Sequence, residues 1–359
     1  MLLECGRQFI SKISIYNRDF FAQTTMARPT LSVHLSNYND ASSIGEAIEA
    51  IVRQSHAPDE FVIVDDGSTD ESIEVIERYM RKYPIIRLVR NDKNYGVVYT
   101  INRGLSLATG DYIYFASAND RVLPGFFKTS MSLLKQFPTA AMSCTDARLI
   151  YADTGREITN GAKRFVDKAG FLTGPQLAAK LNGKAMHGAS YITRRQILVE
   201  MGGYLPQLRW HCDYFLHHMI AFRFGTCYIP EELVLWRYAE RGAYSSGRHN
   251  LPMQRQVLRE MIRLLAQPEY SGLVDLVARA QLLAIFRPAM NGRQLLNMVQ
   301  DAATQPQATL LRYLLWESSV GKSQWLVEQS AEILANRCEQ IWARSFHEYD
   351  RLRSLLSAR

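Results

Sequence analysis

The chain has 359 residues, of which 47% are hydrophobic and 21% charged, so it can bury a full core in one large domain with an appendage or in two domains. Its formal net charge of +7 favours an anionic partner such as a nucleotide or a phospholipid surface. No arginine-rich tract alternates with aromatic residues, so we do not expect a nucleic-acid partner.

Residues 1–28 are predicted to be a poorly ordered extension without a signal peptide, because charged residues interrupt their apolar runs, and Met26 is an alternative start to Met1. The five cysteines are scattered and form no CxxC pair, which favours a reduced, cytoplasmic setting. The best apolar stretch, residues 273–286, is broken by charges and is shorter than the roughly 20 residues of a membrane span. We therefore expect a cytoplasmic protein, and peripheral contact with the inner membrane face stays open.

Between Thr30 and about Thr145, short apolar runs alternate with helix-like segments, which is typical of βαβ units and a parallel sheet. Ser-x-x-Glu capping boxes at Ser43 and Ser68 predict two helix starts, and Pro124 predicts the first residue of a third helix. The predicted strands are Leu31–Leu35, Phe61–Val64, Ile85–Val89, Tyr112–Phe115 and Ala140–Cys144.

A second block, His187–Tyr238, contains more aromatic residues and histidines. Gly203 and Gly225 predict the ends of two short helices. Two returning strands are predicted in this block, at Thr226–Ile229 and Leu233–Tyr238.

Beyond Leu251 the apolar spacing becomes helical, so residues 251–359 are predicted to form a C-terminal helical region. Its tryptophans, Trp316, Trp325 and Trp342, favour a small helical core. Docking of these helices on a membrane surface or a partner enzyme is the second interpretation.

The stretch FVIVDDGSTD, residues 61–70, is the most informative part of the sequence. Phe61–Val64 has no polar face, as expected of a strand covered on both sides, and Gly67 permits a sharp turn after Asp65 and Asp66. Open α/β sheets bind ligands at the carboxyl ends of their strands. Either aspartate alone can simply cap a turn, so other strand ends must decide.

Polar side chains also follow the first and fourth predicted strands, at residues 37–39 (Asn-Tyr-Asn) and at Asn119 and Asp120. Three polar strand ends on one sheet edge favour a binding site over three separate turn caps. Neither a GxGxxG nor a P-loop motif occurs, which argues against the usual dinucleotide and P-loop sites.

Four segments occur in the order seen in family 2 glycosyltransferases, which the chain resembles over Thr30–Tyr244: SVHLSNYN, FVIVDDGSTD, NYGVVYTINRGLSLATGDYIYFASAND and WHCDYF. The family has the GT-A fold, a Rossmann-like, mostly parallel sheet flanked by helices, and its members are inverting enzymes that use nucleotide sugars. The resemblance therefore implies a GT-A domain at residues 29–250, followed by the helical region.

By this resemblance, Tyr38 and Asp65 contact the nucleotide base, with Asp65 accepting from the ring imide, and the segment around Asn102 closes the nucleoside pocket. The donor nucleotide site implied in this way consists of Tyr38, Asp65, Asp66, Asn94, Gly96, Asn102 and Ser117.

Family members commonly hold a divalent cation, Mn²⁺ or Mg²⁺, with an Asp-x-Asp motif after the fourth strand, because hard cations prefer oxygen ligands. Here Ser117 and Asn119 replace two of the expected acids and only Asp120 remains, so use of a cation stays open. His249 is a candidate third ligand or an exposed loop histidine. Alternatively, Arg241 and Arg248 neutralise the diphosphate without metal.

The resemblance assigns the acceptor-activating base to Asp213 in WHCDYF, at the start of a predicted helix; the alternative is a helix cap. His211 is predicted to contact the acceptor, and His217 and His218 to pack within the helix.

The resemblance implies transfer of a sugar from a UDP-, GDP- or dTDP-linked donor to a hydroxyl of a glycan or lipid-linked glycan, in polysaccharide, lipopolysaccharide or glycoprotein glycan synthesis. One alternative is an idle sugar-nucleotide binding or scaffold protein, because Ser117 and Asn119 replace acids. A sugar nucleotidyltransferase is the other, but Ser36–Ser43 contains no basic residue to hold a triphosphate.

Overall fold

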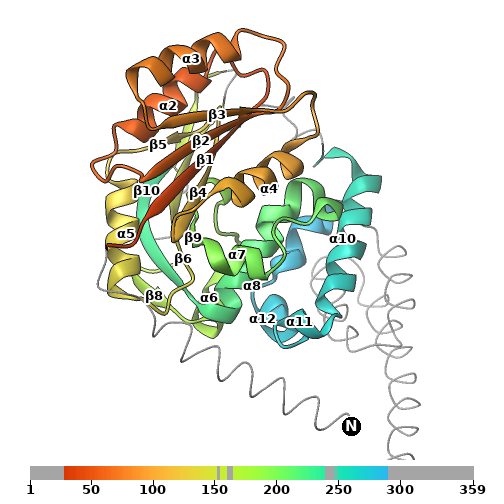
Figure 1. Ribbon diagram of the computed structural model, residues 1–359. Helices are drawn as coiled ribbons and strands as arrows, with labels where there is room; N and C mark the ends of the chain where they lie inside the picture. Colours follow the sequence, from red (N-terminus) through yellow and green to blue (C-terminus); the bar gives the residue numbers. More distant parts are fainter. Residues whose placement is uncertain (1–27, 152–153, 160–164, 239–246, 248, 290–359) are drawn as a thin grey trace, which may run out of the picture. The chain divides into compact units, whose positions relative to one another are not determined.

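The computed structural model describes residues 28–151, 154–159, 165–238, 247 and 249–289 (Figure 1). They belong to two compact units. The first consists of the described parts of Met1–Leu177, Met186–Pro206 and Cys212–Ala239, and the second of those of Ala178–Ala185, Gln207–His211 and Glu240–Arg359.

A mostly parallel sheet runs through the first unit in the strand order β3-β2-β1-β4-β9-β6-β10-β5. Strand β9 is antiparallel to both β4 and β6, and β10 is parallel to β6, so β10 points the same way as β4. The carboxyl ends of β1, β2, β4, β6 and β10 therefore share one side of the sheet, called the carboxyl edge below. The strands that run in this direction are β1 (Leu31–Asn37), β2 (Glu60–Asp65), β3 (Ile86–Arg90), β4 (Tyr112–Ser117), β6 (Met142–Tyr151) and β10 (Thr226–Tyr238). The other strands pair antiparallel with their neighbours: β5 (Arg121–Val122), β7 (Glu157–Thr159), β8 (Gly170–Leu172) and β9 (Ile192–Arg194).

Helices cover both faces of this sheet (Figure 1). Helices α2 (Ile44–Val52), α3 (Ser72–Lys82) and α5 (Phe126–Gln136) share one apolar core with alternate residues of β1. Helix α4 (Val97–Leu107) contacts β1 and β2, and there Gly104 lies so close to His34 that a Cβ would meet its Nδ1 at 2.2 Å. The other helical elements that begin in this unit are α6 (Gly174–Leu181), η1 (Gly188–Ser190), α7 (Arg195–Glu200), η2 (Pro206–His211) and α8 (Cys212–Phe224).

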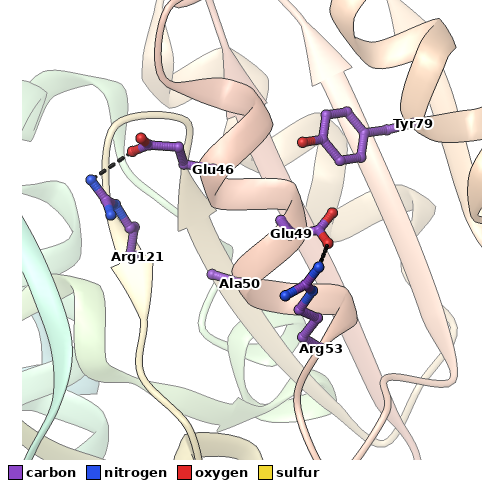
Figure 2. A pocket seen from close by; sticks show the side chains of 6 residues that line it. All are labelled: Glu46, Glu49, Ala50, Arg53, Tyr79 and Arg121. Atoms are coloured by element: carbon purple, nitrogen blue, oxygen red, sulfur yellow. Dashed lines mark ion pairs between the residues drawn. The ribbon is translucent and has the colours of Figure 1, made fainter.

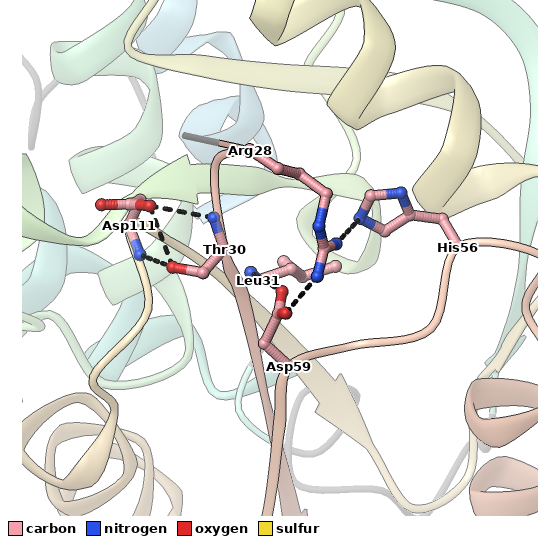
Figure 3. Close-up of polar contacts among 6 residues, drawn as sticks. All are labelled: Arg28, Thr30, Leu31, His56, Asp59 and Asp111. Carbon is pink, nitrogen blue, oxygen red and sulfur yellow. Dashed lines mark hydrogen bonds and ion pairs between the residues drawn. The ribbon is translucent and has the colours of Figure 1, made fainter. Parts of the chain in front are cut away.

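Polar side chains fix the amino end of β1 (Figure 3). Asp111 Oδ2 accepts hydrogen bonds from the backbone N–H and the hydroxyl of Thr30, both at 2.9 Å. Asp59 Oδ2 accepts from Leu31 N at 2.9 Å, and its other oxygen pairs with Arg28. These bonds satisfy backbone groups at the start of the central strand, and we call this side the amino edge.

The described part of the second unit is largely helical. Helix α10 (Leu251–Leu265) starts at the predicted boundary, with Asn250 Oδ1 accepting from Met253 N at 3.1 Å, and its predicted apolar face is buried. Helices α11 (Pro268–Ser271), α12 (Val274–Arg279) and η3 (Leu282–Ala289) follow. None of the helices that the structure describes combines the length and apolar character needed to cross a bilayer. The three tryptophans of the predicted helical core lie outside the described residues.

Several local predictions were wrong in detail. Neither capping box forms: the Ser43 side chain makes no cap bond, and α3 begins at Ser72 because Ser68 bonds to Asp65 instead. Helix α5 begins at Phe126, two residues after Pro124. The two returning strands are one strand, β10, with register shifts at Glu232 where the sequence had suggested a break.

Candidate active site

The turn after β2 holds Asp65 in a closed set of hydrogen bonds. Its Oδ2 accepts from Asn37 Nδ2 at 2.7 Å and from Ser68 Oγ at 2.5 Å, and its Oδ1 accepts from Ser68 N at 3.0 Å. Asp65 thus caps the turn that Gly67 makes at φ 76°, and it joins the ends of β1 and β2. Its contact with a nucleotide base stays a prediction.

Asp66 organises the segment in front of α4. Its Oδ1 accepts from Asn91 Nδ2 at 2.6 Å and from Tyr95 N at 3.0 Å, and its Oδ2 accepts from Gly96 N at 2.8 Å. Asn94 Oδ1 also accepts from Gly96 N, at 2.9 Å. Asp66, Asn94 and Gly96, which were predicted together, are therefore joined by hydrogen bonds at the carboxyl edge.

Asn102 and Tyr38 differ in what they can offer a ligand. Asn102 donates to Tyr204 O at 2.8 Å and accepts from Tyr204 N at 2.9 Å, so its amide ties α4 to the segment before α8, a task that sequence analysis did not foresee. The Tyr38 side chain, at the end of β1, is 44% exposed. Nucleotide contacts of both residues stay predictions.

The end of β4 carries the shortened acidic motif. Ser117 Oγ donates to Asn119 Oδ1 at 2.8 Å, while Asp120 is buried and accepts from Arg237 N at 2.9 Å through Oδ1. Burial raises the pKa of Asp120 to about 7, against the opposing effect of Arg237.

Arginines stand beside this motif. Glu46 on α2 accepts from Arg121 at 2.6 Å and from Arg237 at 3.3 Å, which leaves the three groups with one net positive charge. Among the residues that the structure describes, no three histidine, cysteine, aspartate or glutamate side chains gather as metal ligands. His249, which is exposed and belongs to the second unit, was one predicted ligand; the role stays a prediction. Arg241 and Arg248 lie outside the described residues.

Asp213 lies in the first turn of α8, which leads into β10 and so begins toward the carboxyl edge. Its Oδ1 accepts from Tyr214 N at 2.7 Å, and its Oδ2 lies so close to Gly188 that a Cβ there would be 2.4 Å away. Burial raises the pKa of Asp213 to about 6. Burial and the Asp213 charge together raise the pKa values of Tyr191 and Tyr204 well above 10.

Two histidines near Asp213 hydrogen-bond to the backbone of their own helix, α8. His217 and His218 are buried in α8 and bond through Nδ1 to Asp213 O at 3.0 Å and to Tyr214 O at 2.6 Å. Burial lowers their pKa values to about 3 and about 4, so both stay neutral. Their predicted packing role agrees with these contacts. His211 is buried beside Gln254 Oε1 at 3.1 Å in the second unit, and its predicted contact with an acceptor stays a prediction.

A surface depression of about 370 Å³ lies along α2 (Figure 2), and Asp213 is not among the residues that line it. Glu49 pairs with Arg53 at 2.5 Å and Glu46 pairs with Arg121, so its ionic groups neutralise one another. Its ionic groups leave it without net charge, and we assign it no function.

Part of the chain matches a known protein family. Residues 32–198 match the family model described as glycosyl transferase family 2. This matched segment, just under half of the chain, is similar to the members of that family. The matched segment contains the turn after β2, the loop held by Asp66 and the motif at Asp120, but it ends before Asp213.

Curated relatives align with this chain over part of their length. The uncharacterized glycosyltransferase YibD of Escherichia coli is 26% identical over 234 residues, which cover 63% of this chain and 63% of the relative. The putative glycosyltransferase EpsE of Bacillus subtilis is 32% identical over 109 residues, 30% of this chain and 39% of that protein.

Solved structures show that the fold is GT-A. TarS residues 1–349 of S. aureus, in complex with UDP-GlcNAc, superposes with a TM-score of 0.60 at 16% identity and covers 87% of this chain and 92% of that one. The mannosyltransferase PcManGT of Pyrobaculum calidifontis, in complex with GDP-Man and Mn²⁺, gives a TM-score of 0.51 at 18% identity, with coverage of 95% and 98%.

Proposed function

We propose that this chain is an inverting glycosyltransferase that moves a hexose or related sugar from a nucleoside-diphosphate sugar to a hydroxyl acceptor. Asp213 carries the proposal, because it is a carboxylate with a pKa raised to about 6, next to the backbone of Gly188. The match of residues 32–198 to the family model and the fold neighbours bound to UDP-GlcNAc and to GDP-Man support the choice of donor class.

In this reaction Asp213 takes the proton of the acceptor hydroxyl. The acceptor oxygen bonds to the anomeric carbon as the bond from that carbon to the diphosphate breaks, so the configuration inverts and the nucleoside diphosphate leaves. A base works best when its pKa lies near the working pH. Asp213 is ionised at pH 7, yet it is a stronger base than an exposed aspartate with a pKa of 3.8.

The donor would lie along the carboxyl edge. Tyr38 and Asp65 at the ends of β1 and β2 would hold the base, and the loop fixed by Asp66 would close over the nucleoside. The diphosphate would face Asn119 and Asp120, where Arg237 supplies positive charge to the departing group.

A divalent cation fits the described residues poorly. Asp120 already accepts a backbone hydrogen bond, and Asn119 accepts from Ser117. If Mn²⁺ or Mg²⁺ binds, Asn119 and Asp120 would hold it, and it would neutralise diphosphate charge. No step of the reaction above depends on it.

We propose that the reaction takes place in the cytoplasm, in the synthesis of a polysaccharide, a lipopolysaccharide or a glycoprotein glycan. Buried free thiols at Cys144, Cys212 and Cys227 are consistent with a reduced compartment. The proposed acceptor is a hydroxyl of a glycan or of a lipid-linked glycan.

A thermal-shift panel of UDP, GDP, dTDP and CDP, each with and without Mn²⁺, tests the donor site. One nucleotide should stabilise the protein by about 2.7 kcal/mol at 100 times its Kd. If none of the four shifts the unfolding temperature, the donor-site proposal is wrong. If a nucleotide sugar binds but neither transfer nor hydrolysis follows with or without metal, the protein is an idle binding protein, the alternative raised by Ser117 and Asn119.

A further inference from the structure

A chain of contacts runs from helix α4 to the residue proposed as the base, and we call it the α4–α8 link: Asn102, Tyr204 and His217. The Asn102 amide donates to Tyr204 O at 2.8 Å and accepts from Tyr204 N at 2.9 Å. The ring centroids of Tyr204 and His217 are 5.8 Å apart, and His217 Nδ1 donates to the backbone oxygen of Asp213 at 3.0 Å. All of these residues belong to the first unit, so the link lies within one compact body.

The backbone before α8 leaves room for the Asn102 amide. Gly203 adopts φ 72°, and a Cβ on it would lie 2.7 Å from Asn102 Oδ1, so a larger residue would force the amide away. Tyr204, the next residue, is 2% exposed, and its ring packs edge-to-face on Phe115 of β4 at a centroid distance of 5.1 Å. Tyr204 is therefore held at its backbone by α4 and at its ring by β4 and α8.

Tyr204 also lies within electrostatic range of the proposed base. Burial, and after it the negative charge of Asp213, raises the pKa of Tyr204 well above 10. A charge has this effect only when it is close to the phenol. The link thus reaches Asp213 at two places, at its backbone through His217 and near its carboxylate through Tyr204.

The start of α4 belongs to the proposed donor site. Asp66 accepts from Tyr95 N at 3.0 Å and from Gly96 N at 2.8 Å, immediately before the helix begins at Val97. Asn102 lies in the middle of the same helix, which has 11 residues. Because a helix rises by a fixed amount of about 1.5 Å per residue, the loop proposed to close over the nucleoside and the Asn102 amide keep a constant separation.

Sugar transfer needs a connection of this kind, because the base and the donor are held by different elements. The base must lie beside the attacking oxygen while that oxygen is in line with the anomeric carbon, and an error of about 1 Å can cost a factor of about 100 in rate. The donor is proposed to lie against the ends of β1 and β2 and the loop before α4, whereas Asp213 belongs to α8. Its carboxylate accepts from Tyr214 N in the same helix, so its place follows that of α8.

We infer that Asn102 is a positioning residue of the reaction: through Tyr204 and His217 it sets Asp213 at the correct distance from the donor held by α4, without contacting the nucleotide itself. The inference rests on the proposed function and deepens it, because it adds a residue that acts through the base. It gives Asn102 a role different from the nucleotide contact that the family resemblance predicted.

A double-mutant cycle with the full-length protein tests this role. The reaction is hydrolysis of UDP-glucose, UDP-galactose, UDP-GlcNAc, GDP-mannose and dTDP-glucose, in which water replaces the acceptor hydroxyl and Asp213 takes its proton; the released nucleoside diphosphate is measured. Asn102→Ala should lower kcat for the best of these donors about 100-fold and leave its KM within about threefold of the wild type. In the Asp213→Asn background, the same substitution should lower kcat by less than about threefold, because no base remains to be misplaced.

Gln54→Ala is the matched control. The buried Gln54 amide also joins two elements through their backbones: it donates to Leu123 O at 2.9 Å and accepts from Phe127 N at 3.4 Å. Loss of this amide should lower the thermal unfolding temperature, as loss of the Asn102 amide should, but it should leave kcat per folded molecule unchanged.

Tyr204→Leu tests the other end of the link and decides the question if Asn102→Ala does not fold. It keeps the backbone bonds to Asn102 and removes the ring that packs against His217. We expect a loss of kcat of about 100-fold in the wild-type background and of less than about threefold in the Asp213→Asn background. Tyr204→Phe keeps the ring and should keep kcat within about threefold of the wild type.

The inference and the proposed function fail in different ways. An equal loss of kcat from Asn102→Ala or Tyr204→Leu with and without Asp213, or the same loss in Gln54→Ala, would overturn the inference. A rise of about tenfold in donor KM at unchanged kcat would overturn it too, because Asn102 would then contact the nucleotide, and the proposed function would stand. If the wild type hydrolyses none of the five donors with or without Mn²⁺, or if Asp213→Asn hydrolyses them as fast as the wild type does, the proposed function itself fails, and the inference fails with it.

Discussion

The two edges of the sheet use aspartates differently. At the amino edge, Asp59 and Asp111 accept hydrogen bonds from the start of β1, and Arg28 pairs with Asp59 (Figure 3). At the carboxyl edge, burial raises the pKa of Asp120 to about 7 and that of Asp213 to about 6.

This difference shows what separates a structural carboxylate from a candidate base. A carboxylate that closes backbone hydrogen bonds stabilises the fold as an anion, whereas one that is buried with little compensation is held near its titration point. Asp65 and Asp66 lie at the carboxyl edge, yet by their hydrogen bonds they resemble the acids of the amino edge. Position at the edge is thus not enough to identify the base.

The largest expected effect is that of Asp213→Asn. The amide keeps the size and can still accept from Tyr214 N, but it cannot take a proton, so transfer should fall about 10³-fold. Initial rates of sugar transfer, measured at saturating donor, check this. Transfer within twofold of the wild type would rule out Asp213 as the base.

The second prediction concerns pH. Since the pKa of Asp213 is raised to about 6, the protonated and inactive form should dominate below that pH. The value of kcat/KM for the acceptor should therefore fall about tenfold for each pH unit below 6. A rate that stays level down to pH 4.5 would mean that the base has an ordinary carboxyl pKa and is a different residue.

Asp120→Asn should show how much the ionised carboxylate of the buried Asp120 lowers the free energy of unfolding. The folded pKa, about 7, lies above the unfolded value of 3.8, so the folded state holds the proton more tightly and stability falls as pH rises between the two values. The amide oxygen can keep the bond from Arg237 N. The variant should thus be more stable than the wild type by about 4 kcal/mol at pH 8, and most of the gain should vanish at pH 4.

Urea unfolding at the two pH values measures this difference. An equal change at both would show that Asn acts through packing and not through the charge of Asp120.

Much of the fold was predictable because local patterns determine it. The apolar run Phe61–Val64 has one physical solution, a covered strand, and the glycine after Asp66 does adopt the positive φ that the turn requires. Long-range pairing was not predictable. That the Ser68 hydroxyl accepts from Asn37 and Asn39 instead of capping α3, or that Glu232 bulges within one strand, depends on neighbours far along the chain.

The site divides in the same way. The sequence pattern placed Asp66 and Gly96 in one site, and they are hydrogen-bonded to each other. It missed the approach of Gly188 to Asp213, because that contact joins residues 25 positions apart through the close packing of η1 on α8. A glycine after a histidine carries no signal of its own. The role of Gly188 follows only from its contact with Asp213 in the folded chain.

The smallest effect should come from the amino edge, with Asp111→Ala. Removing the carboxylate leaves the N–H and hydroxyl of Thr30 without this acceptor, but both lie where water can replace it, so the loss of stability should be about 1 kcal/mol. Nucleotide affinity and transfer rate per folded molecule should not change, because the contacts of Asp111 are to the start of β1. Urea unfolding and the nucleotide titration check both halves. A tenfold loss of nucleotide affinity at unchanged stability would mean that the two edges are coupled through β1, and the distinction between structural and functional carboxylates would then fail.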